Sequence, residues 1–296
     1  MSIEVQSFDD FDSLQQIEAQ QSNLIRVVLE GRDDVALFAD QWFVAEQETF
    51  NFIEAGRIVA GSGCSAVLNA VDHSLNADRV PAIGIVDRDV LFRASDWEVL
   101  YEKDHERFIQ ATHSEKVHVA SLWEIEAYLL DPELLRNVVR ACARNAPAEP
   151  GQMDAALQRT LGECAALLDI APYLAGKHSA GVTVPPGYLC NSDIRQMQEE
   201  VARQLLTLAP PSNEVATQVQ GLVEQVKAGL PQAPSEQLSF YLRYIDTKRL
   251  LQRLVHALEL RNFTKWLLSS LQASAGRRPY ELEQVLERAK QRFSIH

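Results

Sequence analysis

The sequence lacks the cysteine and histidine spacings of a zinc site. Its four cysteines, Cys64, Cys142, Cys164 and Cys190, form no CxxC pair, and no histidine pair stands beside them at zinc-finger spacing. We therefore expect reduced, mostly buried thiols in a cytoplasmic protein. No apolar run approaches the roughly 20 residues that span a bilayer. Because residues 1–12 are acidic, we also expect no signal peptide and no membrane partner.

A nucleotide-binding loop is also lacking. The nearest candidate is AGKHS at residues 175–179, but Ala171 stands where GxxxxGK[ST] needs its first glycine, and His178 replaces the hydroxyl residue. If ATP is used, we expect a partner to bind it. Nucleophilic Ser/His/Asp or Cys/His catalysis has no support in the sequence. His113 and His118 flank a predicted strand, and a surface or core role is favoured for both over a catalytic one.

Charge is distributed unevenly along the 296 residues, whose net charge is −13. Residues 1–150 hold 12 Lys+Arg against 27 Asp+Glu, whereas residues 151–296 hold 16 against 14. An acidic half joined to a mildly basic half fits a metal-binding domain followed by a domain that binds phosphate or a partner. Ordinary solvated faces explain the same charges equally well.

Apolar runs and helical spacing predict an α/β fold. Short strands are expected at 23–29, 50–53, 80–86 and 117–120, with helices at 33–43, 64–75 and 122–130 between and after them. This alternation predicts a mostly parallel sheet flanked by helices in an N-terminal domain, residues 1–132. After residue 132 the strand signal fades. Residues 133–296 are predicted to form a C-terminal all-α domain, with helices at 134–144, 153–168, 192–208, 212–227, 247–260, 263–273 and 280–293.

Carboxylates follow two of the predicted strands. Glu30 follows the first strand, and Asp87 and Asp89 follow the third, so neighbouring parallel strands would bring the three acids together. Such a cluster needs compensating positive charge, and Mg²⁺ or Mn²⁺, as one or two ions, is the expected cofactor. Asp33 is expected either to add a ligand or to cap the following helix, and Gly31 to permit a sharp turn. Acidic residues also follow strands simply as helix caps, so DxD alone is a weak signal.

The ordered set of motifs resembles the Toprim domain of topoisomerases, bacterial primases, small ribonucleases and overcoming-lysogenization-defect nucleases. More closely, it is similar to a Toprim-like family associated with ABC-type ATPases in bacterial phage defence, which includes the PARIS-type effector nuclease. The matching stretches are VVLEGRDDVALF (27–38), GSGCSAV (61–67), AIGIVDRDV (82–90), SLWEIEAYLLDPELL (121–135) and, more weakly, YIDTKRLL (244–251). In the last stretch Thr247 stands where the family often has glycine. The resemblance covers residues 23–135 well and the helical remainder loosely.

The resemblance implies specific roles. Glu30, Asp87 and Asp89 would be the catalytic, metal-binding carboxylates, with Asp33 and Glu126 as supporting ligands. Glu126 matches the acidic residue of the family's IE-x-YLL segment, and Glu124, two positions earlier, is expected only to cap a helix. A solvated helix acid is the alternative for Glu126.

Basic residues supply candidates for nucleic-acid contact. They are Arg88, Lys248, Arg249, Arg253 and Lys265. Arg88 would face either a phosphate or the solvent, and docking on an acidic partner explains the last four equally well. Together these features predict a Mg²⁺-dependent endonuclease that hydrolyses RNA or DNA, gated by an ABC-type ATPase partner in a defence system. The alternative is a catalytically weak scaffolding subunit that docks on such an ATPase. Self-association as a homodimer stays open, and primase or topoisomerase chemistry is less favoured.

Overall fold

The computed structural model describes residues 24–132, 134–145, 149–261 and 263–293. The acidic segment 1–12 and Asn23, the first residue of a predicted strand, lie outside the described residues. Within the described ranges, no helix has both the length and the apolar character needed to cross a membrane.

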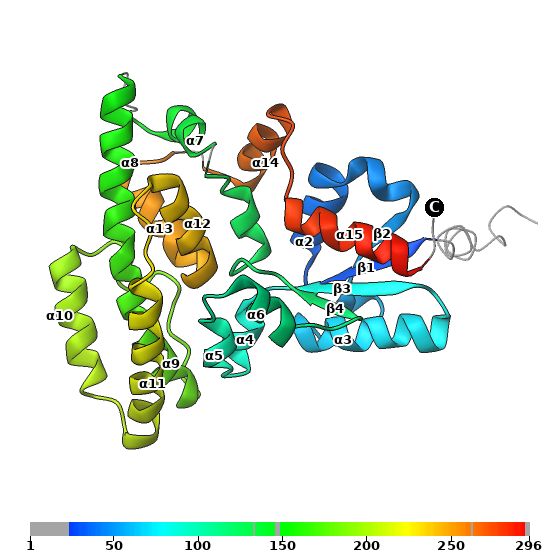
Figure 1. The fold of residues 1–296 in the computed structure, drawn as a ribbon, viewed down its shortest axis with the longest axis horizontal. Coiled ribbons are helices and arrows are strands. Elements are labelled where there is room, and N and C mark those ends of the chain that lie inside the picture. The colour runs from blue at the N-terminus through cyan, green and yellow to red at the C-terminus, as the bar shows by residue number, and fades with distance from the viewer. Residues whose placement is uncertain (1–23, 133, 146–148, 262, 294–296) are drawn as a thin grey trace, which may run out of the picture. The chain divides into compact units, whose positions relative to one another are not determined.

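The fold is α/β, as the sequence predicts, and its sheet is parallel (Figure 1). The strands β1 (Ile25–Leu29), β2 (Phe50–Glu54), β3 (Ala82–Val86) and β4 (Val117–Val119) lie in the order β2-β1-β3-β4. All five side chains of β3 are buried, which explains its continuous apolar run. Val28 of β1 is level with Gly84 of β3, so the carboxyl ends of these two strands meet at one edge.

Contacts divide the chain into two compact units. The sheet unit holds the described parts of residues 1–86, 114–118 and 279–296, and the helical unit holds those of residues 87–113 and 119–278. This division differs from the expected boundary at residue 132. The segments on either side of β4 group with the helices, and the last helix groups with the sheet, because long-range packing decides membership of a unit.

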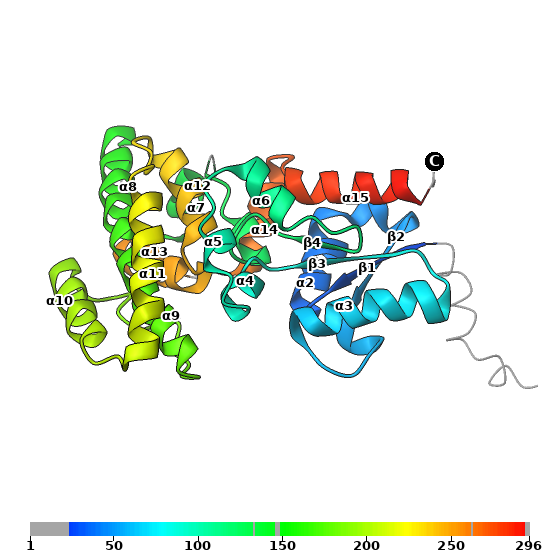
Figure 2. The same ribbon diagram turned by 60° about the horizontal axis from the view of Figure 1, so that its bottom comes forward.

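Helices cover both faces of the sheet within the sheet unit. Figures 1 and 2 show α3 (Gly63–His73) on one face, with α2 (Arg32–Leu37) and α15 (Tyr280–Arg292) on the other. Helix α3 approaches closely because Gly84 has no side chain: a Cβ there would lie 2.6 Å from Val67 Cγ1. On the opposite face, Glu281 of α15 pairs with His118, whose Nε2 lies 2.8 Å from the Glu281 Oε1. This contact links β4 to α15 within the sheet unit.

The helical unit contains every helix predicted between residues 133 and 278, with changed ends. They are α7 (Leu135–Cys142), α8 (Pro150–Cys164), α10 (Ile194–Leu205), α11 (Pro210–Lys227), α13 (Thr247–Ala257) and α14 (Lys265–Ser274). Helices that the sequence analysis missed are α4 (Asp89–Arg93), α5 (Trp97–Leu100), α6 (His105–Ala111), α9 (Ala171–Ser179) and α12 (Pro234–Tyr244). The phosphate-loop look-alike at 175–179 is the end of α9, a regular helix.

Two further predictions concern the cysteines and the segment 122–130. All four cysteines are free; Cys142, Cys164 and Cys190 are buried, and Cys64 is partly exposed. The helix predicted at 122–130 is wrong, because only η6 (Ile125–Leu129) is helical, as a short 3₁₀ segment. The residues before it are not helical, and this changes which acidic side chain points inward.

Candidate metal centre

Two strand ends position the acidic cluster. Glu30 directly follows β1, and Asp87 directly follows β3, its neighbour in the sheet. One peptide bond links Asp87 to Val86, the last residue of the buried strand β3. Glu30, Asp87 and Asp89 each offer one carboxylate oxygen, and these three oxygens lie within 4.8 Å of one another. The cluster expected from the sequence therefore forms.

Hydrogen bonds from residues 123–125 hold the two aspartates in place. Asp87 Oδ1 accepts a bond of 2.8 Å from the Ile125 backbone N–H, and the Asp89 N–H donates to the Trp123 carbonyl oxygen at 3.2 Å. A carboxylate that accepts a backbone N–H keeps one orientation, as a metal ligand must. The same two bonds fix Glu124, which stands between Trp123 and Ile125, beside the aspartate pair.

The two carboxylate oxygens of Asp89 differ: one forms an ion pair, and the other has no hydrogen-bond partner among the described residues. Its Oδ2 forms an ion pair of 2.6 Å with Arg93, one turn along α4. Its Oδ1 is buried and has no hydrogen-bond partner among the described residues. Burial raises the pKa of Asp89 above its usual value, although the charge of Arg93 acts in the opposite direction. An unsatisfied buried acceptor typically costs about 1–3 kcal/mol, and a bound cation would relieve that cost.

Arg88 does not face a phosphate, and this expectation is corrected. Its side chain is fully buried, and its guanidinium donates to the carbonyl oxygens of Leu100 and Ser121, at 3.0 Å for the latter. The guanidinium also lies 4.0 Å from the centre of the Phe108 ring, a cation–π contact. Arg88 therefore braces the segments around the aspartates instead of binding a ligand.

The turn after Glu30 differs in detail from the expectation. Gly31 has φ −139°, an extended value open to any residue, so no sharp glycine turn occurs there. Asp34, not Asp33, caps α2, because its Oδ2 accepts the Gly31 N–H at 3.0 Å. Asp33 is exposed and does not belong to the three-carboxylate cluster.

The acid that packs beside the aspartates is Glu124 rather than Glu126. Glu126 is partly exposed in η6 and does not join the cluster within the described residues. Glu124 is only 5 % exposed, and its side chain makes no cap bond to η6. Its Oε1 lies 2.5 Å from Lys248 Nζ, while its Oε2 is buried without a hydrogen-bond partner in the described part of the chain. The role expected for Glu126, and the capping role expected for Glu124, are therefore not supported.

The Glu124–Lys248 pair has perturbed ionisation. Burial raises the pKa of Glu124 to about 7, against the opposing effect of its hydrogen bond to Lys248. Burial alone would lower the pKa of Lys248, but the hydrogen bond and charge of Glu124 outweigh it and the pKa is raised. Lys248 is thus engaged by a carboxylate, although its side chain remains more than half exposed.

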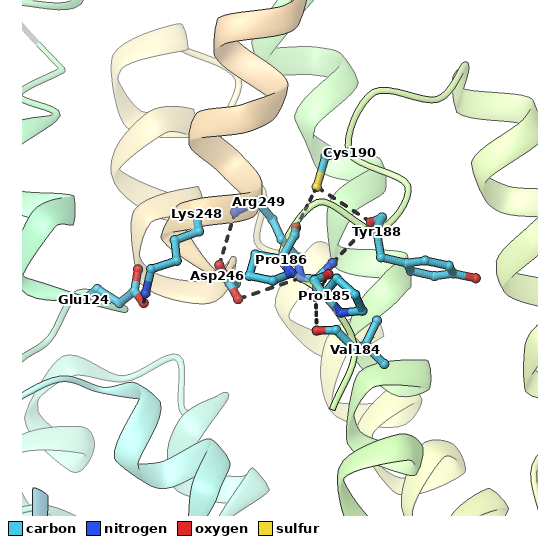
Figure 3. A network of polar contacts seen from close by, with 9 residues as sticks. All are labelled: Glu124, Val184, Pro185, Pro186, Tyr188, Cys190, Asp246, Lys248 and Arg249. Carbon is cyan, nitrogen blue, oxygen red and sulfur yellow. Dashed lines mark hydrogen bonds and ion pairs between the residues drawn. The ribbon is translucent and has the colours of Figure 1, made fainter. Parts of the chain in front are cut away.

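Two other side chains that were expected to contact nucleic acid are also buried, and they form hydrogen bonds within the protein. Arg249 donates to the carbonyl oxygens of Val184, Pro185 and Tyr188 (Figure 3). Arg253 donates to the Ser192 carbonyl and pairs with Glu163 at 2.5 Å. Both arginines are under 10 % exposed, so a role in phosphate contact is not supported for them. Lys265 is partly exposed, and its Nζ lies 5.3 Å from the centre of the Trp266 ring.

A cavity of about 160 Å³ adjoins this carboxylate region in the helical unit. Asp89 and Glu124 form part of its lining, together with aromatic residues from α4 and α9 and the segment 182–184. No pattern in the sequence indicates this cavity, because its walls come from segments far apart in the chain. Comparison of the chain with protein-family models, with curated proteins and with solved structures found no match.

Proposed function

We propose that this protein is a divalent-metal-dependent phosphodiesterase that hydrolyses RNA or DNA. The observation that carries the proposal is the convergence of Glu30, Asp87 and Asp89 at the carboxyl ends of two neighbouring parallel strands. In open α/β sheets this edge is where ligands bind. Nucleic acid as the substrate follows from the Toprim resemblance of the same motifs, as does gating by an ABC-type ATPase partner.

The residues fit a hard divalent cation. All three donors are carboxylate oxygens, which Mg²⁺ and Mn²⁺ prefer, and the Oδ1 of Asp89, unpartnered among the described residues, is available to one. Glu30, Asp87 and Asp89 would hold the ion. When bound, such an ion polarises a phosphoryl oxygen and lowers the pKa of a water nucleophile.

The protein's own groups orient the reaction. Asp87 is held by the Ile125 N–H and so presents its second oxygen in a fixed direction. Glu30, at the end of the neighbouring strand, is the candidate to accept the proton of the attacking water. Arg93 is half exposed, so its guanidinium can leave Asp89 and pair with a phosphate oxygen of the substrate.

A scaffolding function is the second candidate, and the Arg93–Asp89 ion pair favours it. A guanidinium 2.6 Å from a ligand oxygen supplies in part the charge that a cation would bring, and so weakens metal binding. In that case the protein would dock on an ATPase without cutting nucleic acid. Metal affinity separates the two functions.

The decisive experiment combines calorimetry with cleavage. Glu30→Gln and Asp87→Asn remove one negative charge each, and the amide introduced by Asp87→Asn keeps an oxygen that can accept the Ile125 N–H, which preserves the fold. Both variants should lose Mn²⁺ binding and more than about 100-fold of Mg²⁺-dependent cleavage of pooled RNA and DNA substrates. Asp40→Asn, which alters an exposed acid outside the cluster, should behave as wild type.

Two results would count against the nuclease proposal. Cleavage that persists in both cluster variants would place the chemistry elsewhere. A wild-type chain that binds neither Mg²⁺ nor Mn²⁺ at millimolar concentration would favour the scaffold, whatever the trigger for activity is.

A further inference from the structure

The cavity beside Asp89 has aromatic, aliphatic and charged residues in its lining. The Phe92 ring lies 5.0 Å from the His178 ring and 6.3 Å from the Trp123 ring, measured between centroids. Leu174 and Val184 add aliphatic surface, and Asp246 and Arg249 add charged groups besides Asp89 and Glu124. An aromatic and aliphatic lining of this kind accepts a planar group, and its polar side chains can fix the orientation of that group.

His178 is fixed as part of the aromatic wall. Its Nε2 lies 3.2 Å from the Arg93 carbonyl oxygen, which can only accept, so Nε2 carries a proton. The neighbouring Trp97 ring meets His178 edge-on at 6.1 Å. The wall is therefore preorganised by packing and by a hydrogen bond before any ligand enters.

Glu124, one of the residues that line the cavity, has a buried acceptor without a donor among the described residues. Glu124 has a side chain that is 6 % exposed, and its Oε2 has no hydrogen-bond partner among the described residues. Lys248 occupies only Oε1, and Figure 3 shows its side chain extending from α13 to Glu124. Buried acceptors of this kind are nearly always satisfied, so the site calls for a ligand N–H.

We infer that this cavity binds a nucleobase with an exocyclic amino group, which donates to Glu124 while its ring packs against Phe92. The inference rests on the proposed function, since the base would belong to the nucleic acid whose phosphodiester lies at Asp89. An acyl chain would leave Glu124 without a donor. Uracil and thymine have no amino group, and their N3–H stands between two carbonyl oxygens that a carboxylate repels, so they are disfavoured.

Cytidine and uridine give a matched pair of probes. They have the same ring size and differ at C4, an amino group in cytidine and a carbonyl in uridine, and at N3, which carries a hydrogen only in uridine. Neither carries a phosphate, so no metal is needed. Saturation-transfer NMR and calorimetry on the full chain in EDTA should give cytidine about tenfold tighter binding than uridine. Equal binding, a preference for uridine, or no detectable binding of either nucleoside overturns the inference.

Variants test the two halves of the site separately. Glu124→Gln should abolish the preference for cytidine, because an amide can accept from cytosine or donate to uracil. Phe92→Leu should weaken the binding of both nucleosides by about the same factor. Glu98→Gln, at an exposed acid of α5 that does not line the cavity, should leave both affinities unchanged. A preference that survives Glu124→Gln contradicts the assigned role of Glu124.

The outcome also separates this inference from the nuclease proposal. Metal-dependent cleavage without a preference between the two nucleosides would support the proposed function and contradict the nucleobase site. A nucleoside preference in a chain that binds neither Mg²⁺ nor Mn²⁺ would support the pocket and contradict the phosphodiesterase.

Discussion

Lys248 Nζ lies 2.5 Å from Glu124 Oε1, a contact between residues 124 positions apart in the chain. It ties the segment after β4 to the first turn of α13 in the helical unit. Glu124 is almost fully buried and Lys248 is more than half exposed, so the pair places a carboxylate inside the unit and its counter-charge at the surface. The stability of the protein should therefore depend on the ionisation of Glu124.

The pH dependence has a definite sign. The pKa of Glu124 is about 7 in the folded chain, against an ordinary value of 4.5, so the folded chain binds more protons between these two pH values. The free energy of unfolding should consequently fall as the pH rises from 4.5 to 7. Relative to Glu124→Gln, the wild type should lose about 3 kcal/mol across this window, measured by urea denaturation in EDTA. Glu98→Gln should show a constant difference from wild type, and a constant difference for Glu124→Gln would refute the assignment.

Arg93 should compete with the metal for Asp89. Removing its charge by Arg93→Gln frees Oδ2 and makes the cluster more negative, so Mn²⁺ should bind about two- to fivefold more tightly by calorimetry. Arg136→Gln is the matched control, because it breaks the Arg136–Asp154 ion pair, also 2.6 Å long and half exposed, outside the cluster. Weaker Mn²⁺ binding in Arg93→Gln would mean that Arg93 supports the site instead.

Arg88 should be a determinant of stability. Arg88→Met should raise the population of unfolded chain, because the carbonyl oxygens of Leu100 and Ser121 would lose their donors inside the unit. We expect a loss of about 3 kcal/mol or more in the free energy of unfolding, against under about 0.5 kcal/mol for Arg107→Gln at an exposed position. A small effect of Arg88→Met in chemical denaturation would show that water replaces the guanidinium.

The acidic cluster was predictable because it follows from strand order. Runs of apolar residues ending in Glu30 and Asp87 predict two buried strands, and parallel pairing then brings their carboxyl ends together. The inward acid near residue 125 was not predictable from helical spacing. A helix over 122–130 was expected, but helical backbone starts only at Ile125, so Glu124 turns inward and Glu126 stays partly exposed.

The burial of the arginines and the unpredicted helices have separate causes. Arg249 and Arg253 bind carbonyl oxygens 61 to 65 residues away, and no local pattern encodes such partners. Helices α9 and α12 carry proline in their first turn, where proline is compatible with a helix start. Long-range packing therefore makes Arg249 and Arg253 structural residues.

Gly84 should be intolerant of even one added carbon. Gly84→Ala places a Cβ 2.6 Å from Val67 Cγ1 and 3.2 Å from Val71 Cγ2, which forces α3 away from β3. Overpacking of this kind should lower the free energy of unfolding by about 1–3 kcal/mol in urea denaturation. Gly162→Ala in α8, where a Cβ meets nothing within 4 Å, should instead raise stability by about 0.5–1 kcal/mol through helix propensity. Because Asp87 directly follows β3, Gly84→Ala should also weaken Mn²⁺ binding. If both substitutions instead raise the free energy of unfolding, α3 does not pack against β3 as closely as described.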